Sequence, residues 1–75
     1  MNPKHAENYQ KLGLNVVHYR KLRKLTQENL AESINKERNT ISNIECAATG
    51  VSLDTLFDIA EALEIPIHKL FEFRD

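Results

Sequence analysis

Residues Leu25 to Glu45 read LTQENLAESINKERNTISNIE, and this stretch decides the fold. Thr26 is a residue type that often caps a helix N-terminus, because its hydroxyl can accept a hydrogen bond from a free backbone N–H in the first turn. The apolar residues that follow recur at the spacing of one buried helix face: Leu30, Ala31 and Ile34. We therefore expect a short capped helix to open the stretch.

A turn and a polar helix complete the stretch. Asn35 stands where the chain must turn, and asparagine is among the few non-glycine residues that tolerate a left-handed backbone. The helix predicted after it, roughly Glu37 to Ala48, has only Ile41 and Ile44 as firm core positions. Its outward side would carry Arg38, Asn39, Ser42 and Asn43. We therefore expect this helix to present a largely polar surface.

Helical periodicity continues on both sides of the stretch. A first helix is predicted from about Glu7 to Arg23, with an apolar stripe at Leu12, Val16 and Tyr19. Ser52 is expected to cap a fourth helix, whose buried stripe consists of Leu53, Leu56, Ile59, Ala60 and Leu63.

A short fifth helix is predicted from Pro66 to about Phe71, because proline suits the first turn of a helix. No alternating stretch suggests a sheet, so the fold class is all-α. With 75 residues the chain has room for one core. We predict one compact five-helix domain over residues 1–75, with residues 1–6 as a flexible N-terminus.

Charge is distributed unevenly along the chain. The net charge of −1 argues by itself against a nucleic-acid partner, because neutralising phosphates requires cations. However, residues 1–44 contain eight lysines and arginines against four acids, a net +4, whereas residues 45–75 contain two against seven, a net −5. Such polarity allows one face to approach DNA. The alternative is an even mixture of solvated charges.

Apolar runs and cysteine content indicate the cellular compartment of the protein. No apolar run approaches the ~20 residues that span a bilayer, and the N-terminus lacks the apolar stretch of a secretion signal. A single cysteine, Cys46, fits a reducing compartment. We expect a cytoplasmic protein that has no membrane partner.

A capped helix, a turn and a polar helix in this order have helix-turn-helix geometry, in which the second helix can lie in the major groove of DNA. The segment resembles the phage repressor/Cro-type (XRE-like) helix-turn-helix family, which includes the controller proteins of restriction–modification systems. The resemblance extends from about Leu12 to Phe71 and rests on LTQENLA, ISNIE, SLDTL and KLF, each at the family's spacing. It implies a lambda-repressor-like domain with the motif at helices 2 and 3, and a sequence-specific DNA-binding transcriptional regulator of repressor or controller type. It also implies that a bacterium or phage encodes the protein, which would lie on the nucleoid when bound to DNA.

The resemblance also implies roles for individual residues. Gln27 occupies the place of a glutamine that contacts a DNA phosphate in the family, and Lys36 is a further candidate for a phosphate contact. The base-reading positions fall on Arg38, Asn39 and Asn43, with Thr40 and Ser42 nearby. Arginine can read guanine and asparagine can read adenine, so these residue types fit the role.

Arg20 and Glu45 match a family pair that forms a partly buried salt bridge, which we interpret as scaffold. The sequence also departs from the family pattern, since Asn35 and Ala47 stand where glycine is usual. Glu37 replaces a commonly small hydroxylated cap. Its carboxylate suits the helix dipole but would repel a phosphate unless it accepts from a cytosine amine. We therefore include Glu37 among the candidate DNA-binding residues, as one that shapes specificity.

The C-terminal segment is a candidate dimer interface. One helix pair reads only a few base pairs, so domains of this type usually bind palindromic sites as homodimers. The segment holds more apolar residues than so small a domain should bury, and exposed apolar patches often mark interfaces. The candidates are Ile65, Ile67, Phe71 and Phe73. The alternative is that these residues simply close the core.

We expect no enzymatic activity, cofactor or metal. The chain has no glycine-rich phosphate loop, and its three histidines show no metal-ligand spacing with Cys46. The alternative to a DNA-binding regulator is an antitoxin-like interaction module of the same fold, which binds a toxin or another protein, with DNA binding secondary. A neighbouring toxin gene would favour that reading. A neighbouring methyltransferase or endonuclease gene would favour a controller.

Overall fold

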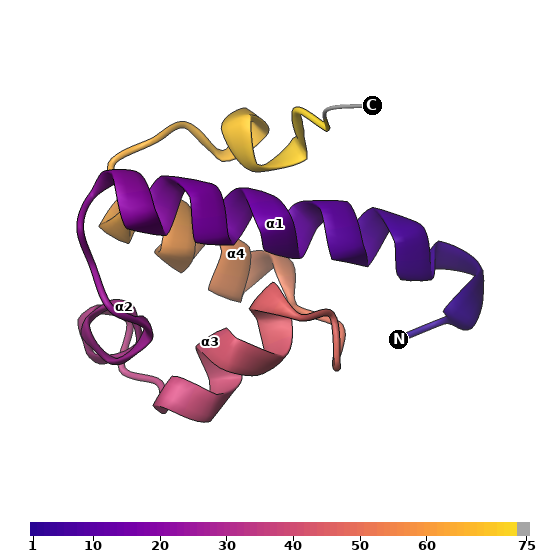
Figure 1. The fold of residues 1–75 in the computed structure, drawn as a ribbon, viewed down its shortest axis with the longest axis horizontal. Coiled ribbons are helices and arrows are strands. Elements are labelled where there is room, and N and C mark those ends of the chain that lie inside the picture. Colours follow the sequence, from indigo (N-terminus) through magenta and orange to yellow (C-terminus); the bar gives the residue numbers. More distant parts are fainter. Residues whose placement is uncertain (74–75) are drawn as a thin grey trace.

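The computed structural model describes residues 1–73, which are folded into helices and contain no strand. The elements in chain order are η1 Pro3–His5, α1 Ala6–Leu22, α2 Gln27–Ser33, α3 Arg38–Glu45, α4 Leu53–Ala62 and η2 Ile67–Phe71, where η denotes a 3-10 helix. Figure 1 shows α1 crossing the molecule, with α2 and α3 on one side of it, α4 behind it and η2 on the opposite side. The all-α prediction is confirmed.

The predicted count of five α-helices is not confirmed, because residues 1–73 contain four. The segment predicted as a fifth α-helix is the five-residue 3-10 helix η2. Pro66 precedes it with an extended backbone, at φ −67° and ψ 147°. The remaining residues form one short turn, which is the length that 3-10 geometry serves. The last two residues of the predicted domain, Arg74 and Asp75, lie outside the described residues.

The N-terminal residues form a turn that leads directly into α1. Residues 1–6 were expected to form a flexible N-terminus, and the structure places the 3-10 helix η1 there. The Asn2 side chain accepts a hydrogen bond of 2.9 Å from the backbone N–H of Lys4. No helix within residues 1–73 is both long and apolar enough to cross a bilayer.

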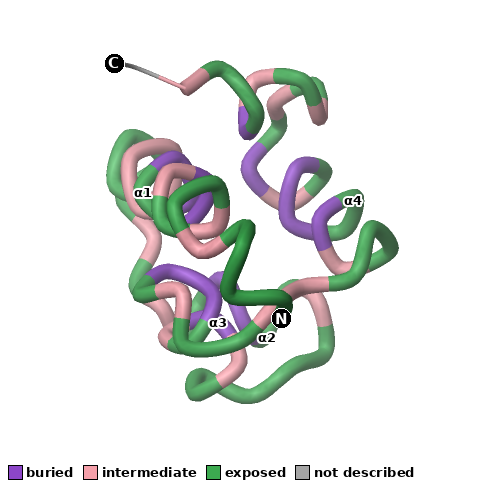
Figure 2. Tube along the Cα trace, turned by 90° about the vertical axis from the view of Figure 1, so that its right-hand side faces the viewer, coloured by how far each residue is buried: buried purple, intermediate pink, exposed green. Residues whose placement is uncertain are grey.

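One core lies between α1, α3 and α4. The tube in Figure 2 shows the buried stretches of these helices facing one another. The fully buried side chains are Val16, Leu30, Ile41, Ile59, Leu63 and Leu70. They come from all four α-helices, from the residue directly after α4 and from η2. The stripe predicted for the fourth helix is buried at Leu56, Ile59, Ala60 and Leu63, but the prediction is wrong for Leu53, which is the first residue of α4, at the edge of the core, and is 60% exposed. Burial of these stripes is the main source of the fold's stability.

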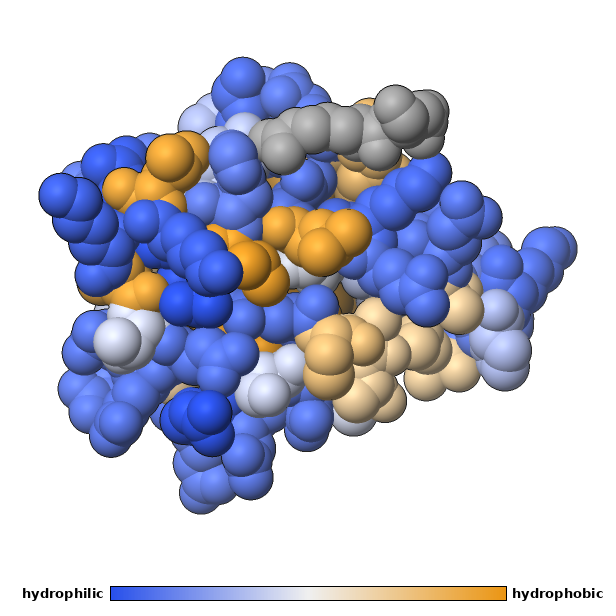
Figure 3. All heavy atoms as spheres, in the orientation of Figure 1, coloured by the Kyte–Doolittle hydropathy of each residue, from blue (hydrophilic) through white to orange (hydrophobic). Residues whose placement is uncertain are grey.

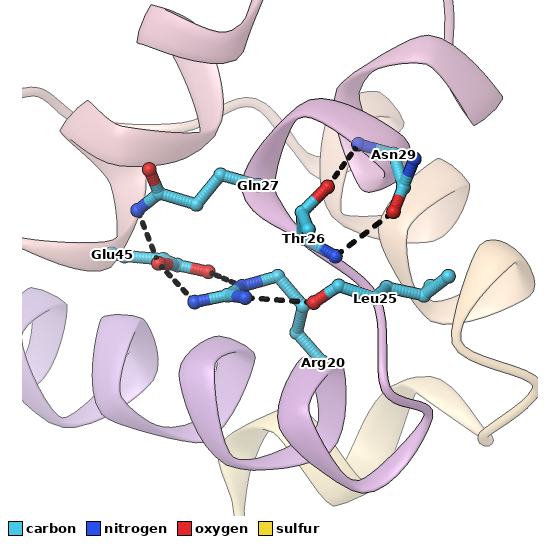
Figure 4. Close-up of polar contacts among 6 residues, drawn as sticks. All are labelled: Arg20, Leu25, Thr26, Gln27, Asn29 and Glu45. Carbon is cyan, nitrogen blue, oxygen red and sulfur yellow. Dashed lines mark hydrogen bonds and ion pairs between the residues drawn. The ribbon is translucent and has the colours of Figure 1, made fainter.

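Side-chain caps fix where α2 and α4 begin. The Thr26 hydroxyl accepts a 2.9 Å hydrogen bond from the backbone N–H of Asn29, and the Asn29 side-chain oxygen accepts from the N–H of Thr26 at 3.2 Å. Figure 4 shows this reciprocal pair. The Ser52 hydroxyl accepts from the N–H of Thr55 at 3.2 Å. The predicted caps Thr26 and Ser52 are confirmed.

Each α-helix is followed, within residues 1–73, by a non-glycine residue with a left-handed backbone: Lys24, Asn35, Ala47 and Glu64. At the turn between α2 and α3, Asn35 has φ 59°, as predicted, and the N–H of Lys36 donates to the carbonyl of Ala31 at 2.9 Å. Ala47, at φ 57°, ends α3 at Glu45, earlier than the predicted Ala48. A left-handed residue ends each helix abruptly. At Asn35 this makes the connection between α2 and α3 short.

Candidate nucleic-acid interface

The outward face of α3 is polar, and its opposite face is core. Ile41 and Ile44 are buried, whereas Thr40 and Ser42 are half-buried at the edge. The exposed residues at the start of the helix and along it are Lys36, Glu37, Arg38, Asn39 and Asn43. In Figure 3 the part of the surface over α2 and the start of α3 is hydrophilic. The candidate base-reading residues therefore lie on one accessible surface.

These exposed side chains have no partner within residues 1–73. The structure shows no hydrogen bond or ion pair from the side chains of Lys36, Glu37, Arg38, Asn39 or Asn43 to the described part of the chain. Polar groups that hold the fold together are instead bonded internally. The surface of α3 therefore keeps its donors and acceptors available for an external partner, which is what base recognition requires.

A buried ion pair joins α1 to the end of α3, shown in Figure 4. Arg20 Nε donates to Glu45 Oε2 at 2.6 Å, and Arg20 Nη2 donates to Glu45 Oε1 at 3.3 Å. The side chains are only 11% and 5% exposed. Arg20 Nη1 also donates to the carbonyl of Leu25 at 2.8 Å, just before α2. One guanidinium thus ties together α1, the loop before α2 and the end of α3.

Gln27, the first residue of α2, is linked to the same carboxylate. Its Nε2 donates to Glu45 Oε1 at 2.8 Å. Because a carboxylate paired with arginine only accepts, the amide nitrogen rather than its oxygen must face Glu45. The second N–H of the Gln27 amide nitrogen has no hydrogen-bond acceptor within the described part of the chain. The structure thus brings the predicted phosphate contact Gln27 to the predicted pair Arg20 and Glu45, a link that sequence reasoning missed.

Two other polar residues that hold the scaffold were also missed. Arg23 Nε donates to the carbonyl of Leu63 at 2.8 Å, and its guanidinium lies 3.4 Å from the carboxylate of Glu64. Arg23 therefore provides a hydrogen-bond donor for a backbone carbonyl at the end of α4, where the helix itself offers none. Asn15 is buried, and its Nδ2 donates to the carbonyls of Leu70 at 2.8 Å and Glu72 at 3.2 Å. No local signal marks either contact, because the partners are 40 or more residues away along the chain.

The four candidate dimer residues are buried to different degrees. Ile65, Ile67 and Phe73 are half-buried and pack against the core, whereas Phe71 is 45% exposed. An open groove of about 410 Å³ lies beside Phe71, and its mainly apolar lining includes Tyr9, Leu12, Leu53 and Leu56. Leu53 and Phe57, on one face of α4, are 60% and 51% exposed. The exposed apolar surface is therefore shared between η2 and α4.

A second exposed apolar surface lies on α1. Leu14 and Leu22 are 65% and 63% exposed. Hydrophobic residues gather over α1 on the face shown in Figure 3, between hydrophilic surroundings. This surface is distinct from the groove beside Phe71, whose lining includes neither leucine.

Comparisons with known proteins agree with this geometry. A family model described as helix-turn-helix matches residues 18–70. An uncharacterized HTH-type transcriptional regulator of Methanocaldococcus jannaschii is 38% identical over 58 residues, which cover 77% of this chain and 88% of that protein.

Two solved structures are similar. The restriction-modification controller protein C.AhdI of Aeromonas hydrophila superposes with a TM-score of 0.86 at 30% identity, covering 89% of this chain and 97% of that one. A hypothetical transcription factor, NHTF, from Neisseria has a TM-score of 0.84 at 23% identity, covering 88% of this chain and 76% of that one, and shows the shared fold.

Proposed function

This chain belongs to the helix-turn-helix family of transcriptional regulators, and on that premise we propose that it binds a palindromic DNA operator as a homodimer and regulates transcription there. The observation that carries the proposal is the set of exposed polar side chains on α3 that have no partner within residues 1–73. In a helix-turn-helix the second helix enters the major groove and its N-terminal residues meet the base edges. Arg38 would read guanine, and Asn39 and Asn43 would read adenine, with Thr40 and Ser42 beside them.

The phosphate contacts would come from the residues next to α3. Lys36 is exposed at the turn and is free of ion pairs within residues 1–73. Gln27 would use the amide N–H that Glu45 does not take. Such contacts position the protein on the duplex without reading its sequence. A regulator of this kind would act in the cytoplasm, where bacterial or phage DNA lies.

Dimerisation would use the exposed apolar surface of α4 and η2. Leu53, Phe57 and Phe71 are each about half exposed or more, and a second copy seated on them would remove this apolar area from water. Ile65, Ile67 and Phe73 are half-buried and pack against the core, so each would contribute only its exposed part to this interface. A twofold dimer would present two α3 helices to two half-sites of a palindrome.

A controller role within a restriction–modification system is the form of regulation that the comparisons favour. The controller C.AhdI matches this chain over 97% of its own length at 30% identity. A methyltransferase or endonuclease gene beside the gene for this protein would support that role.

A protein-binding module of the same fold is the second candidate. It is favoured by Leu14 and Leu22, whose exposure on α1 neither DNA binding nor the proposed dimer surface explains. A toxin-like or other protein partner could cover them. In that case DNA binding would be secondary.

The experiment that tests the proposal is selection of binding sites from random duplex DNA, followed by titration of the selected site at several salt concentrations. We expect an enriched palindrome and an affinity that falls steeply with salt, because phosphate contacts release counterions. The absence of any enriched sequence would overturn the DNA-binding proposal and favour the protein-binding module.

A further inference from the structure

Glu37 is an acidic residue at the start of α3 whose side chain does not cap the helix. It occupies the N-cap position with φ −85° and ψ 154°, yet its side chain makes no capping hydrogen bond. At the equivalent positions of α2 and α4, the hydroxyls of Thr26 and Ser52 do cap their helices. The Glu37 carboxylate is thus not used to satisfy the helix that it precedes.

The carboxylate is not used in an ion pair either. Lys36 and Arg38 flank Glu37 in sequence and all three are exposed, but none is ion-paired to another residue of the described chain. A charged acceptor therefore stands unpaired on a surface that, under the proposed function, approaches a polyanion. Close to phosphates, an unpaired carboxylate lowers affinity. The helix dipole offsets part of this cost, and a hydrogen-bond donor on the DNA that faces the carboxylate would return the rest.

The chemistry of the base edges restricts that partner. A carboxylate only accepts hydrogen bonds. In the major groove guanine offers two acceptors, thymine an acceptor and a methyl group, and adenine an acceptor beside its amino group. Cytosine offers an amino donor with no acceptor next to it, and so it is the base that an acid contacts favourably.

We propose that Glu37 determines specificity by accepting a hydrogen bond from the exocyclic amino group of one cytosine in each half-site. This inference rests on the proposed function, and it adds the base that α3 selects at its N-terminal end. The main effect of Glu37 is to weaken binding to sequences that lack this cytosine. Opposite any other base its charge is left desolvated and unpaired, so binding there is weakened more than binding to the correct site is strengthened.

The test compares the wild-type protein with Glu37→Gln, which keeps the size of the side chain and removes its charge. Each base pair of the selected operator is substituted in turn, and both proteins are titrated at one salt concentration. For the wild type we expect about a tenfold or greater preference for cytosine at one position of the half-site. For Glu37→Gln we expect that preference to disappear at this position alone, and non-specific DNA to bind several-fold more tightly.

Glu61→Gln is the matched control, because it makes the same charge change at an exposed site on α4. It should keep the cytosine preference. Glu37→Gln should also fold normally, as judged by circular dichroism, because no capping bond is lost. An unchanged base preference in Glu37→Gln, or an equal loss at all positions, would overturn this inference alone. A wild type that selects no sequence would instead overturn the proposed function on which it rests.

Discussion

Gly13 in α1 lies against the backbone of Glu45 at the end of α3. A Cβ built on Gly13 would be 2.5 Å from the carbonyl oxygen of Glu45 and 2.6 Å from that of Ile44. Neither backbone oxygen can move aside as a flexible side chain could. Because glycine has no side chain, α1 and α3 can approach each other closely at Gly13. This close contact fixes the position of α3 relative to α1.

Gly13→Ala should destabilise the protein although alanine is the better helix former. Overpacking of this kind costs about 1–3 kcal/mol, more than the roughly 1 kcal/mol that alanine gains in a helix. Urea unfolding followed by circular dichroism measures the loss. Gly50→Ala is the control, since the nearest atom to its Cβ would be a side-chain carbon of Met1 at 3.3 Å. Equal stability of Gly13→Ala and wild type would contradict the close contact.

Glu45→Ala should lower the free energy of unfolding by about 3 kcal/mol or more, because Arg20 would remain as a buried cation without its carboxylate. Gln27 would lose its acceptor as well. The measurement is urea unfolding, which gives the midpoint and the dependence of the free energy of unfolding on urea concentration. Glu61→Ala removes an exposed acid from α4 and should change stability by less than about 0.5 kcal/mol. If both variants unfold at the same midpoint, the ion pair does not stabilise the fold.

Ala47→Gly should raise the free energy of unfolding by roughly 0.5–1 kcal/mol. Ala47 has φ 57°, where a Cβ costs about 1–2 kcal/mol, and glycine's greater freedom in the unfolded state offsets part of that gain. Thermal melting provides the comparison. The neighbouring Ala48→Gly should not stabilise, because Ala48 is not among the positive-φ residues of the described chain. A lower melting temperature for Ala47→Gly would refute the strain argument.

Arg38→Ala and Asn43→Ala should each reduce affinity for the selected operator by about tenfold, since a good side-chain contact to a base contributes roughly 1–3 kcal/mol of discrimination. Helicity should not change, because both side chains are exposed and unpaired within residues 1–73. Footprinting and titration on operator and on unrelated DNA separate specific from general losses. Gln10→Ala, on an exposed site of α1, serves as control. Unchanged footprints would show that Arg38 and Asn43 do not contact the bases of the operator.

Leu53→Ser combined with Phe71→Ser should shift the protein to monomers in sedimentation equilibrium and weaken operator binding. Leu53 and Phe71 are 60% and 45% exposed and neither is part of the buried core, so their replacement should leave the monomer folded. Phe73 is half-buried against the core, so its replacement would also lower the stability of the monomer. Leu14→Ser on α1 should leave the dimer intact. A dimer that persists without Leu53 and Phe71 would move the interface elsewhere on the molecule.

The sequence alone determines the features of this protein that depend on neighbours a few residues away. Thr26 and Ser52 cap their helices through N–H groups three residues along, and Asn35 turns the chain through its own backbone preference. The apolar stripes likewise follow from helical periodicity, which is local. The polar face of α3 was predictable for the same reason, since Ile41 and Ile44 fix which side of the helix is buried.

Most long-range polar contacts inside the molecule could be seen only in the tertiary structure, although the family resemblance implied one of them, the pair of Arg20 and Glu45. Helical periodicity places Arg38 on the outward side of its helix, and its side chain is unpaired within residues 1–73. No local pattern, however, marks Arg23 as the residue that donates to the backbone carbonyl of Leu63 at the end of α4. Gln27 meets Glu45, and Asn15 meets Leu70, because separate helices pack together. The packing of η2 against α1 and α4 was likewise visible only in the structure. Such partners lie far apart along the chain, and so local propensity carries no information about them.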